Sequence, residues 1–220
     1  MTDPKSFSWL KDSPQLLLAV MKFNQPSIDS IHIERQPAWL QRAPIASLEQ
    51  TRRGRRRLVG CLANWAGFQT TGFYDFQPWY RRVTLLPICE LEQLALYLGT
   101  ELISTRIAKL IRRVDIEEAK RQLGERLYHF ALERSAWPNL SQDETTPNSE
   151  IRKDDLSLLG WQTLASSFSA EPYALRERFG LKLPSSVSVE PGVHQSKGLD
   201  KTVRRIIITE LQTEMAPCFT

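Results

Sequence analysis

Apolar side chains recur at steps of three and four residues along much of the chain, and this spacing predicts helices rather than strands. The pattern is strongest over residues 88–136, where it predicts two amphipathic helices, at about 88–113 and 115–136, that pair as a central hairpin. The apolar stripe of the first helix includes Leu91, Leu94, Ala95, Leu98, Leu102, Ile103, Ile107, Leu110, Ile111 and Val114. The stripe of the second contains Ile116, Ala119, Leu123, Leu127, Phe130 and Ala131. We expect Leu94, Leu98, Leu123 and Leu127 to be buried in the core between these helices.

Local signals mark the ends of the hairpin helices. Asp115, followed three residues later by Glu118, resembles a capping box that starts the second helix. Pro138 disfavours helix at the residue before it, so this helix should end near residue 137. Gly99 lies inside the first helix, where glycine is costly, which indicates a close helix crossing or a helix end near it.

Further helices are predicted on both sides of the hairpin. Residues 14–23 read as a short helix that starts at Pro14, with Ser13 as N-cap. Helices are predicted around residues 52–57, and one side of them is lined by Leu48, Leu58, Leu62 and Trp65. Two more helices carry the apolar residues of 156–168 and 173–179. The last helix begins near Asp200, although the β-branched residues 206–208 leave a strand open, as does "SSVSV" at 185–189.

The polar, proline-containing segment 138–150 reads as a loop or linker. The predicted fold is therefore mainly α, an irregular multi-helix bundle with a central helical hairpin and a Pro-rich loop. We expect a single domain over residues 1–220. A possible subdivision gives an N-terminal helical part at 1–137, a linker at 138–155 and a C-terminal helical part at 156–220.

Composition narrows the class of protein. The chain is 41% hydrophobic and 25% charged, as in an ordinary soluble globular protein. No apolar run approaches the roughly 18–20 residues of a membrane-spanning helix, and the N-terminus lacks the features of a secretory signal, so we expect a cytoplasmic protein. Three widely spaced cysteines, Cys61, Cys89 and Cys218, favour reduced thiols that serve as small apolar side chains over disulfides or a zinc site.

The positive charge is concentrated in one run. Residues 49–57, "EQTRRGRRR", hold five arginines against one glutamate, which equals the net charge of +4 for the whole chain. A nucleic-acid binder more often spreads its basic residues over a surface. The run can be a solvated turn, a contact with an acidic protein surface, or a weak site for membrane headgroups or nucleic acid. Its members are Arg52, Arg53, Arg55, Arg56 and Arg57.

A second basic set lies in the hairpin. Arg106, Lys109 and Arg113 would share one helix face, where they can form helix-stabilising pairs, such as Arg113 with Glu117, or meet an acidic partner surface. Residues 68–82 hold six aromatic side chains. This segment can be a connection packed on the core, a partner-binding patch or a stacking platform for nucleic-acid bases.

The sequence contains no recognisable catalytic or metal-binding pattern. His32, His129 and His194 are not spaced with another histidine, cysteine or acid in a metal or triad arrangement, and His129 fits a satisfied or partly buried helical position better than a ligand position. No phosphate-binding glycine loop occurs. We therefore expect no catalytic residue, no cofactor and no bound metal.

One stretch is similar to a known protein family. Residues 83–137 read "VTLLPICELEQLALYLGTELISTRIAKLIRRVDIEEAKRQLGERLYHFALERSAW", with a Leu-Pro before a leucine-spaced helix that ends in "LG", a basic-apolar "RI-x-x-L-I" helix and an "LGERLYHFAL" helix. This stretch resembles the YscK/SctK family of bacterial type III secretion systems. "PAWLQ" upstream, "GWQTLA" downstream and the Pro-Cys-Phe ending are compatible with that family.

The resemblance implies a non-enzymatic cytoplasmic adaptor of the injectisome sorting platform. Such a protein links the cytoplasmic domain of the inner-membrane ring protein to the spoke protein of the platform, so it would lie at the cytoplasmic face of the inner membrane. It implies no catalytic residue. The alternative is a nucleic-acid-binding or regulatory protein that uses Arg52–Arg57 and the aromatic segment, and a small enzyme with an unrecognised site is the third hypothesis.

Overall fold

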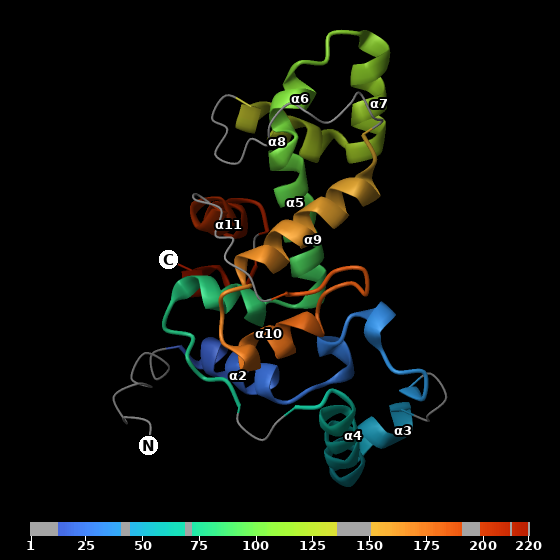
Figure 1. The fold of residues 1–220 in the computed structure, drawn as a ribbon, viewed down its shortest axis with the longest axis vertical. Helices are drawn as coiled ribbons and strands as arrows, with labels where there is room; N and C mark the ends of the chain where they lie inside the picture. The colour runs from blue at the N-terminus through green and yellow to red at the C-terminus, as the bar shows by residue number, and fades with distance from the viewer. Residues whose placement is uncertain are drawn as a thin grey trace. The chain divides into compact units, whose positions relative to one another are not determined.

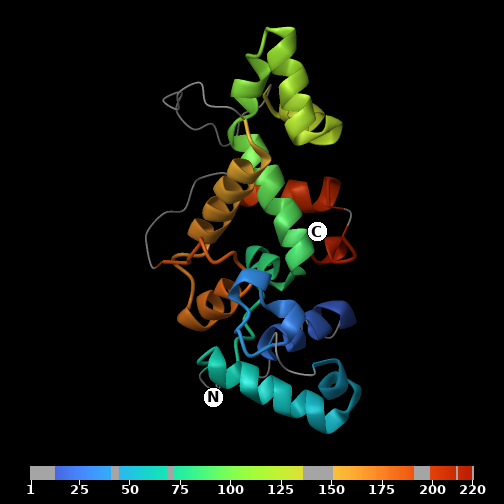
Figure 2. The same ribbon diagram turned by 90° about the vertical axis from the view of Figure 1, so that its right-hand side faces the viewer.

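The computed structural model describes residues 13–40, 45–68, 72–135, 151–190, 199–211 and 213–219. Within these ranges the regular elements are helices and no strand occurs, so the predicted mainly α, multi-helix class is confirmed (Figures 1 and 2). The chain divides into two compact units, each made of separate stretches of sequence. Unit 1 comprises Met1–Ile88, Glu171–Val189 and Glu214–Thr220; unit 2 comprises Cys89–Ala170 and Glu190–Thr213.

Unit 1 is built from short helices. They are α2 (Pro14–Asn24), η2 (Ile28–Ser30), η3 (Ile33–Arg35), α3 (Ile45–Gln50), α4 (Arg52–Trp65), η5 (Trp79–Leu85), α10 (Tyr173–Gly180) and η6 (Ala216–Phe219). Helix α2 begins as predicted, because the Ser13 hydroxyl accepts a hydrogen bond from the Leu16 amide at 3.4 Å and Pro14 occupies the first turn. Beneath α4, a cluster of Ile31, Leu40, Leu58 and Leu62 is buried.

Two basic side chains, the buried Lys182 and the partly buried Arg35, join the distant stretches of unit 1. Lys182 donates from Nζ to the carbonyls of Thr84 at 2.7 Å and Leu86 at 2.9 Å. Arg35 donates to the carbonyls of Leu183, Pro184 and Val187. Because each bond satisfies a main-chain acceptor with a charged donor, these contacts tie the segment after α10 to the N-terminal part of the unit.

Unit 2 contains α5 (Ile88–Leu102, whose first residue is the last of unit 1), α6 (Ser104–Ala108), α7 (Arg113–Leu123), α8 (Glu125–Ser135), α9 (Lys153–Ser167) and α11 (Leu199–Thr209). The predicted hairpin of two helices is corrected to four. Ile103 leaves helical geometry at ψ 8° and ends α5, and Gly124, with φ 78°, separates α7 from α8. The four leucines expected in the core, Leu94, Leu98, Leu123 and Leu127, are buried as predicted.

The predicted capping box is wrong. Helix α7 begins at Arg113, with Arg112 at the N-cap and no side-chain cap. Asp115 therefore lies in the first turn, where its charge suits the helix dipole. Glu118 pairs with Arg121 at 2.5 Å instead of reaching back to the start of the helix.

Helices α5 and α9 cross at two glycines. A Cβ on Gly99 would lie 1.9 Å from the carbonyl oxygen of Leu156, and a Cβ on Gly160 would lie 1.7 Å from that of Ala95. Each glycine thus faces the backbone of the other helix, which brings α5 and α9 into close contact (Figures 1 and 2). Both predictions for Gly99 are confirmed, because it lies at a close helix crossing and α5 ends three residues later, at Leu102.

The C-terminal stretch of unit 2 is helical, so the strand alternative for residues 206–208 is wrong. Helix α11 starts at Leu199, which places Asp200 in the first turn rather than at the cap. Residues 185–189 form no strand. The Pro-rich loop predicted at 138–150 lies outside the described residues.

Candidate interaction surfaces

Thr51 is the N-cap of α4 and separates this helix from α3. The Thr51 hydroxyl accepts a hydrogen bond from the Gly54 amide at 3.0 Å. A Cβ on Gly54 would lie 2.1 Å from the Leu48 carbonyl oxygen, so glycine at this position allows α3 and α4 to meet closely. Glycine is unfavourable inside a helix, so the sequence alone would place a break at Gly54. It lies instead in the first turn of α4, and the break comes before the arginine run.

The arginine surface consists of Arg52, Arg53, Arg55, Arg56 and Arg57 on the N-terminal half of α4. All five residues are exposed, while Gly54, Leu58 and Leu62 form the buried face of the helix. Within the described part of the chain, no hydrogen bond or ion pair involves these five side chains. The first turn carries no acidic residue, so positive charge stands at the positive end of the helix dipole. Among the described residues of this unit the arrangement is electrostatically unfavourable.

The exposed side of α4 continues beyond the arginines to Gly60, Cys61 and Asn64, and Trp65 is 39% exposed. Figure 2 shows α4 along its length, beside α3. Leu58 and Leu62 lie on the buried side as the sequence predicted, whereas Trp65 does not.

A second surface, here called the α6–α7 tip, comprises Ile111, Arg112, Arg113 and Val114. The sequence placed Ile111 and Val114 in the apolar stripe of the hairpin, but they are 90% and 74% exposed. The reason is that no helix continues between Ala108 and Arg113, so the helical period breaks and both side chains face solvent. Arginine is enriched at the hot spots of protein interfaces, and here two arginines lie beside two exposed aliphatic side chains.

The three basic residues predicted to share one helix face do not do so. Arg106 lies in α6, Lys109 in the turn that follows, and Arg113 in the first turn of α7. Arg113 donates to Glu117 at 2.7 Å, the exposed pair that the spacing predicted. Such exposed pairs contribute little to stability, so Arg113 remains available to a binding partner.

Two of the six aromatic side chains of residues 68–82 belong to the core of unit 1. Phe73 and Phe76 are buried and make an edge-to-face contact, with ring centroids 5.2 Å apart. Arg82 donates to the carbonyls of Phe76, Gln77 and Cys218 and holds the segment in place. Phe73 and Phe76 therefore fit the predicted connection packed on the core, whereas Tyr74 is exposed.

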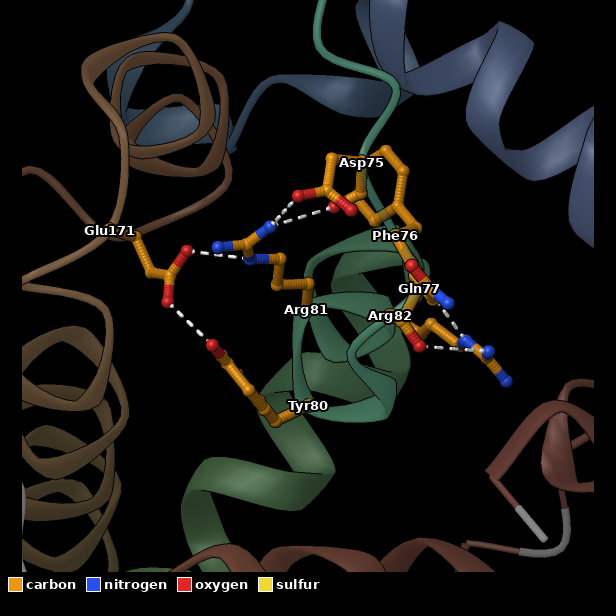
Figure 3. A network of polar contacts seen from close by, with 7 residues as sticks. All are labelled: Asp75, Phe76, Gln77, Tyr80, Arg81, Arg82 and Glu171. Carbon is orange, nitrogen blue, oxygen red and sulfur yellow. Dashed lines mark hydrogen bonds and ion pairs between the residues drawn. The ribbon is translucent and has the colours of Figure 1, made fainter. Parts of the chain in front are cut away.

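A charged network fixes the end of this segment (Figure 3). Arg81 pairs with Asp75 and with Glu171, the latter at 2.7 Å, and the Tyr80 hydroxyl donates to Glu171 at 2.9 Å. Burial alone would lower the pKa of Arg81, but the two carboxylates outweigh it and raise that pKa. Burial and the bond to Glu171 raise the pKa of Tyr80. The network thus favours the charged form of Arg81 and the neutral form of Tyr80, as expected of side chains that stabilise the fold.

The structure also places the cysteines and two of the histidines that the sequence analysis considered. Cys218 is buried, but Cys61 and Cys89 are exposed, so only one of the three thiols serves as an apolar core residue. His129 is exposed and lies 3.8 Å from Glu125, while His32 is buried. In the described ranges, no group of three or more histidines, cysteines and acids is arranged to hold a metal ion. Nor is any helix there long and apolar enough to cross a bilayer.

Comparison with known proteins adds no relative. No model of a protein family, no curated protein and no solved structure matches the chain.

Proposed function

We propose that the protein is a non-enzymatic adaptor that joins two protein partners, using one basic surface on each of its two units. The observation that carries this proposal is the arginine surface: five exposed arginines stand on one helix, and the described residues supply no acid to pair with them. Arginine binds carboxylates through paired hydrogen bonds, so an acidic protein surface is the natural complement. The α6–α7 tip provides a second and different surface, with two exposed aliphatic side chains beside its arginines.

The resemblance of residues 83–137 to the YscK/SctK family gives this proposal its setting. The partners would be the cytoplasmic domain of the inner-membrane ring protein and the spoke protein of a type III secretion sorting platform. The adaptor would act at the cytoplasmic face of the inner membrane, held there by protein contacts and without a cofactor. All four residues of the α6–α7 tip lie within the stretch that carries the resemblance.

The test is a charge reversal of the arginine surface. Changing Arg55, Arg56 and Arg57 together to Glu should leave the fold intact, because all three residues are exposed. Association with the ring or spoke protein should slow by about tenfold or more at low salt, since charges at an interface mainly set the association rate. Stopped-flow binding to each partner alone identifies which one uses this surface, and a secretion assay reports the consequence.

A matched control reverses three exposed lysines elsewhere. Lys22→Glu, Lys153→Glu and Lys201→Glu together change the net charge by the same amount but leave α4 untouched. If the arginine variant folds, binds both partners at wild-type rates in low salt and supports secretion, the arginine surface is merely a solvated helix end. If the wild-type chain instead binds DNA or RNA at physiological salt with a steep salt dependence, the nucleic-acid alternative replaces the adaptor.

A further inference from the structure

Glycines inside helices are explained by close backbone contacts at three positions of the described chain. A Cβ added to Gly54, Gly99 or Gly160 would lie 2.1, 1.9 or 1.7 Å from a carbonyl oxygen of a neighbouring helix. Gly60, in the middle of α4, is different. It is exposed, and a Cβ there would meet no heavy atom within 4 Å. Since glycine weakens a helix interior, nothing within the described chain accounts for its presence there.

The face of α4 that contains Gly60 also carries part of the arginine surface. With about 3.6 residues per turn, Arg56 and Arg57 lie one turn and Arg53 two turns before Gly60, and Ala63 and Asn64 follow it by one turn. This face is opposite the buried side formed by Gly54, Leu58 and Leu62. Arg55 projects from another side of the helix. The face therefore combines three exposed arginines with the small residues Gly60 and Ala63.

We propose that this face of α4 docks an acidic α-helix of a partner protein, whose backbone crosses α4 at Gly60. This inference rests on the proposed adaptor function and specifies what the arginine surface binds. Charge complementarity assigns the acidic character: Arg53, Arg56 and Arg57 carry positive charge on this face, and α4 has no acidic residue. The absence of a side chain at Gly60 assigns the helix, because two helix backbones approach closely only where small residues meet.

A close helix crossing at glycine also occurs within the protein, where Gly99 and Gly160 let α5 and α9 cross in close contact. A nucleic-acid backbone would not explain Gly60. Phosphates are bound by the long arginine side chains at a distance from the helix axis, and all five arginines would contribute similarly. A docked helix instead makes Gly60 critical and makes Arg53 and Arg56 more important than Arg55.

The test compares Gly60→Leu with Gly60→Ala, and the double variant Arg53→Glu/Arg56→Glu with Arg55→Glu. Four probes are used: the ring-protein cytoplasmic domain, the spoke protein, a stapled helical peptide with glutamates beside an alanine stripe, and duplex DNA. Both Gly60 variants should melt at or above the wild-type temperature, because alanine and leucine favour helix more than glycine does. Gly60→Leu should weaken binding of one protein probe and of the peptide by about tenfold or more, since the added side chain overfills the crossing.

Two comparisons make the result specific. Gln162→Leu adds the same side chain to an exposed position of α9 and should leave binding unchanged. Arg53→Glu/Arg56→Glu should reduce binding far more than Arg55→Glu does. If Gly60→Leu folds and binds like wild type while the arginine reversals abolish binding, the surface is purely electrostatic and the docked helix is wrong.

Binding of the helical peptide distinguishes failure of the proposed adaptor function from failure of helix docking. If neither secretion protein binds the wild-type chain, the adaptor role fails, but peptide binding that Gly60→Leu removes still supports helix docking. If the wild-type chain binds neither the peptide nor either protein, helix docking is overturned. Binding of duplex DNA that all five arginines support equally, and that Gly60→Leu does not affect, also overturns it.

Discussion

At the scale of single residues, the surroundings of a charged side chain indicate whether it stabilises the fold or is exposed to a binding partner. Glu101 in unit 2 has a fully buried side chain, and Thr202 and Arg205 donate to it at 3.3 Å. Burial raises the pKa of Glu101, and attraction to Arg205 and Arg134 only partly opposes that rise. The acid is thus a partly compensated buried charge that joins α11 to α5. Among the residues that the structure describes, no acid compensates the exposed arginines of α4 in this way.

The raised pKa of Glu101 predicts how stability depends on pH. The folded state holds its proton more tightly than the unfolded state, so stability falls as pH rises from the ordinary value of 4.5 through the folded pKa, and is constant above it. Glu101→Gln removes this dependence while keeping a polar side chain of similar shape. The variant should therefore gain stability relative to wild type across that window, as measured by urea unfolding at a series of pH values. A stability difference between the two proteins that does not change with pH would contradict the buried charge described here.

The residues of the candidate surfaces were only partly predictable from the sequence. Exposure of Arg52–Arg57 follows from crowding of like charges, which is visible in the sequence alone. Gly54 and Gly60 look alike in the sequence, yet one meets the Leu48 backbone and the other meets open space. Ile111 and Val114 fit an apolar stripe by spacing, and only the break after α6 brings them to the surface.

At the scale of elements, apolar periodicity predicted where helices form but not where they break. The period continues through Ile103 and through Gly124, although both residues leave helical geometry. Such breaks depend on how each half of a helix packs against its neighbours, which spacing along one segment does not contain. By contrast, the start of α2 was predictable because Ser13 and Pro14 act locally.

The crossing of α5 and α9 gives a prediction at this scale. Gly99→Ala or Gly160→Ala should lower the free energy of unfolding by about 2 kcal/mol or more, because a methyl group would overlap a backbone carbonyl that cannot move without separating the helices. Gly60→Ala is the matched control, and it should raise stability by about 0.5–1 kcal/mol through helix propensity alone. Chemical denaturation of the three variants measures both effects. If all three change stability alike, the close crossing is not present in solution.

At the scale of the whole molecule, neither unit is a continuous stretch of sequence. Lys182 bonds to the carbonyl of Thr84, 98 residues earlier, and Arg205 contacts Glu101 from 104 residues later. Local patterns predict each helix involved, but they contain no signal for which distant segments pair. That is why the helical class was predictable and the division into these two units was not.

The central claim is that the protein links two partners and does so through different surfaces. The most direct measurement is analytical ultracentrifugation of the chain with the ring-protein cytoplasmic domain and the spoke protein, each alone and both together. The adaptor account predicts two binary complexes and a larger complex that contains all three proteins. Reversal of Arg55, Arg56 and Arg57 should weaken one binary complex and leave the other. Failure of the chain to bind either protein, or displacement of one by the other with no three-protein complex, would contradict the account.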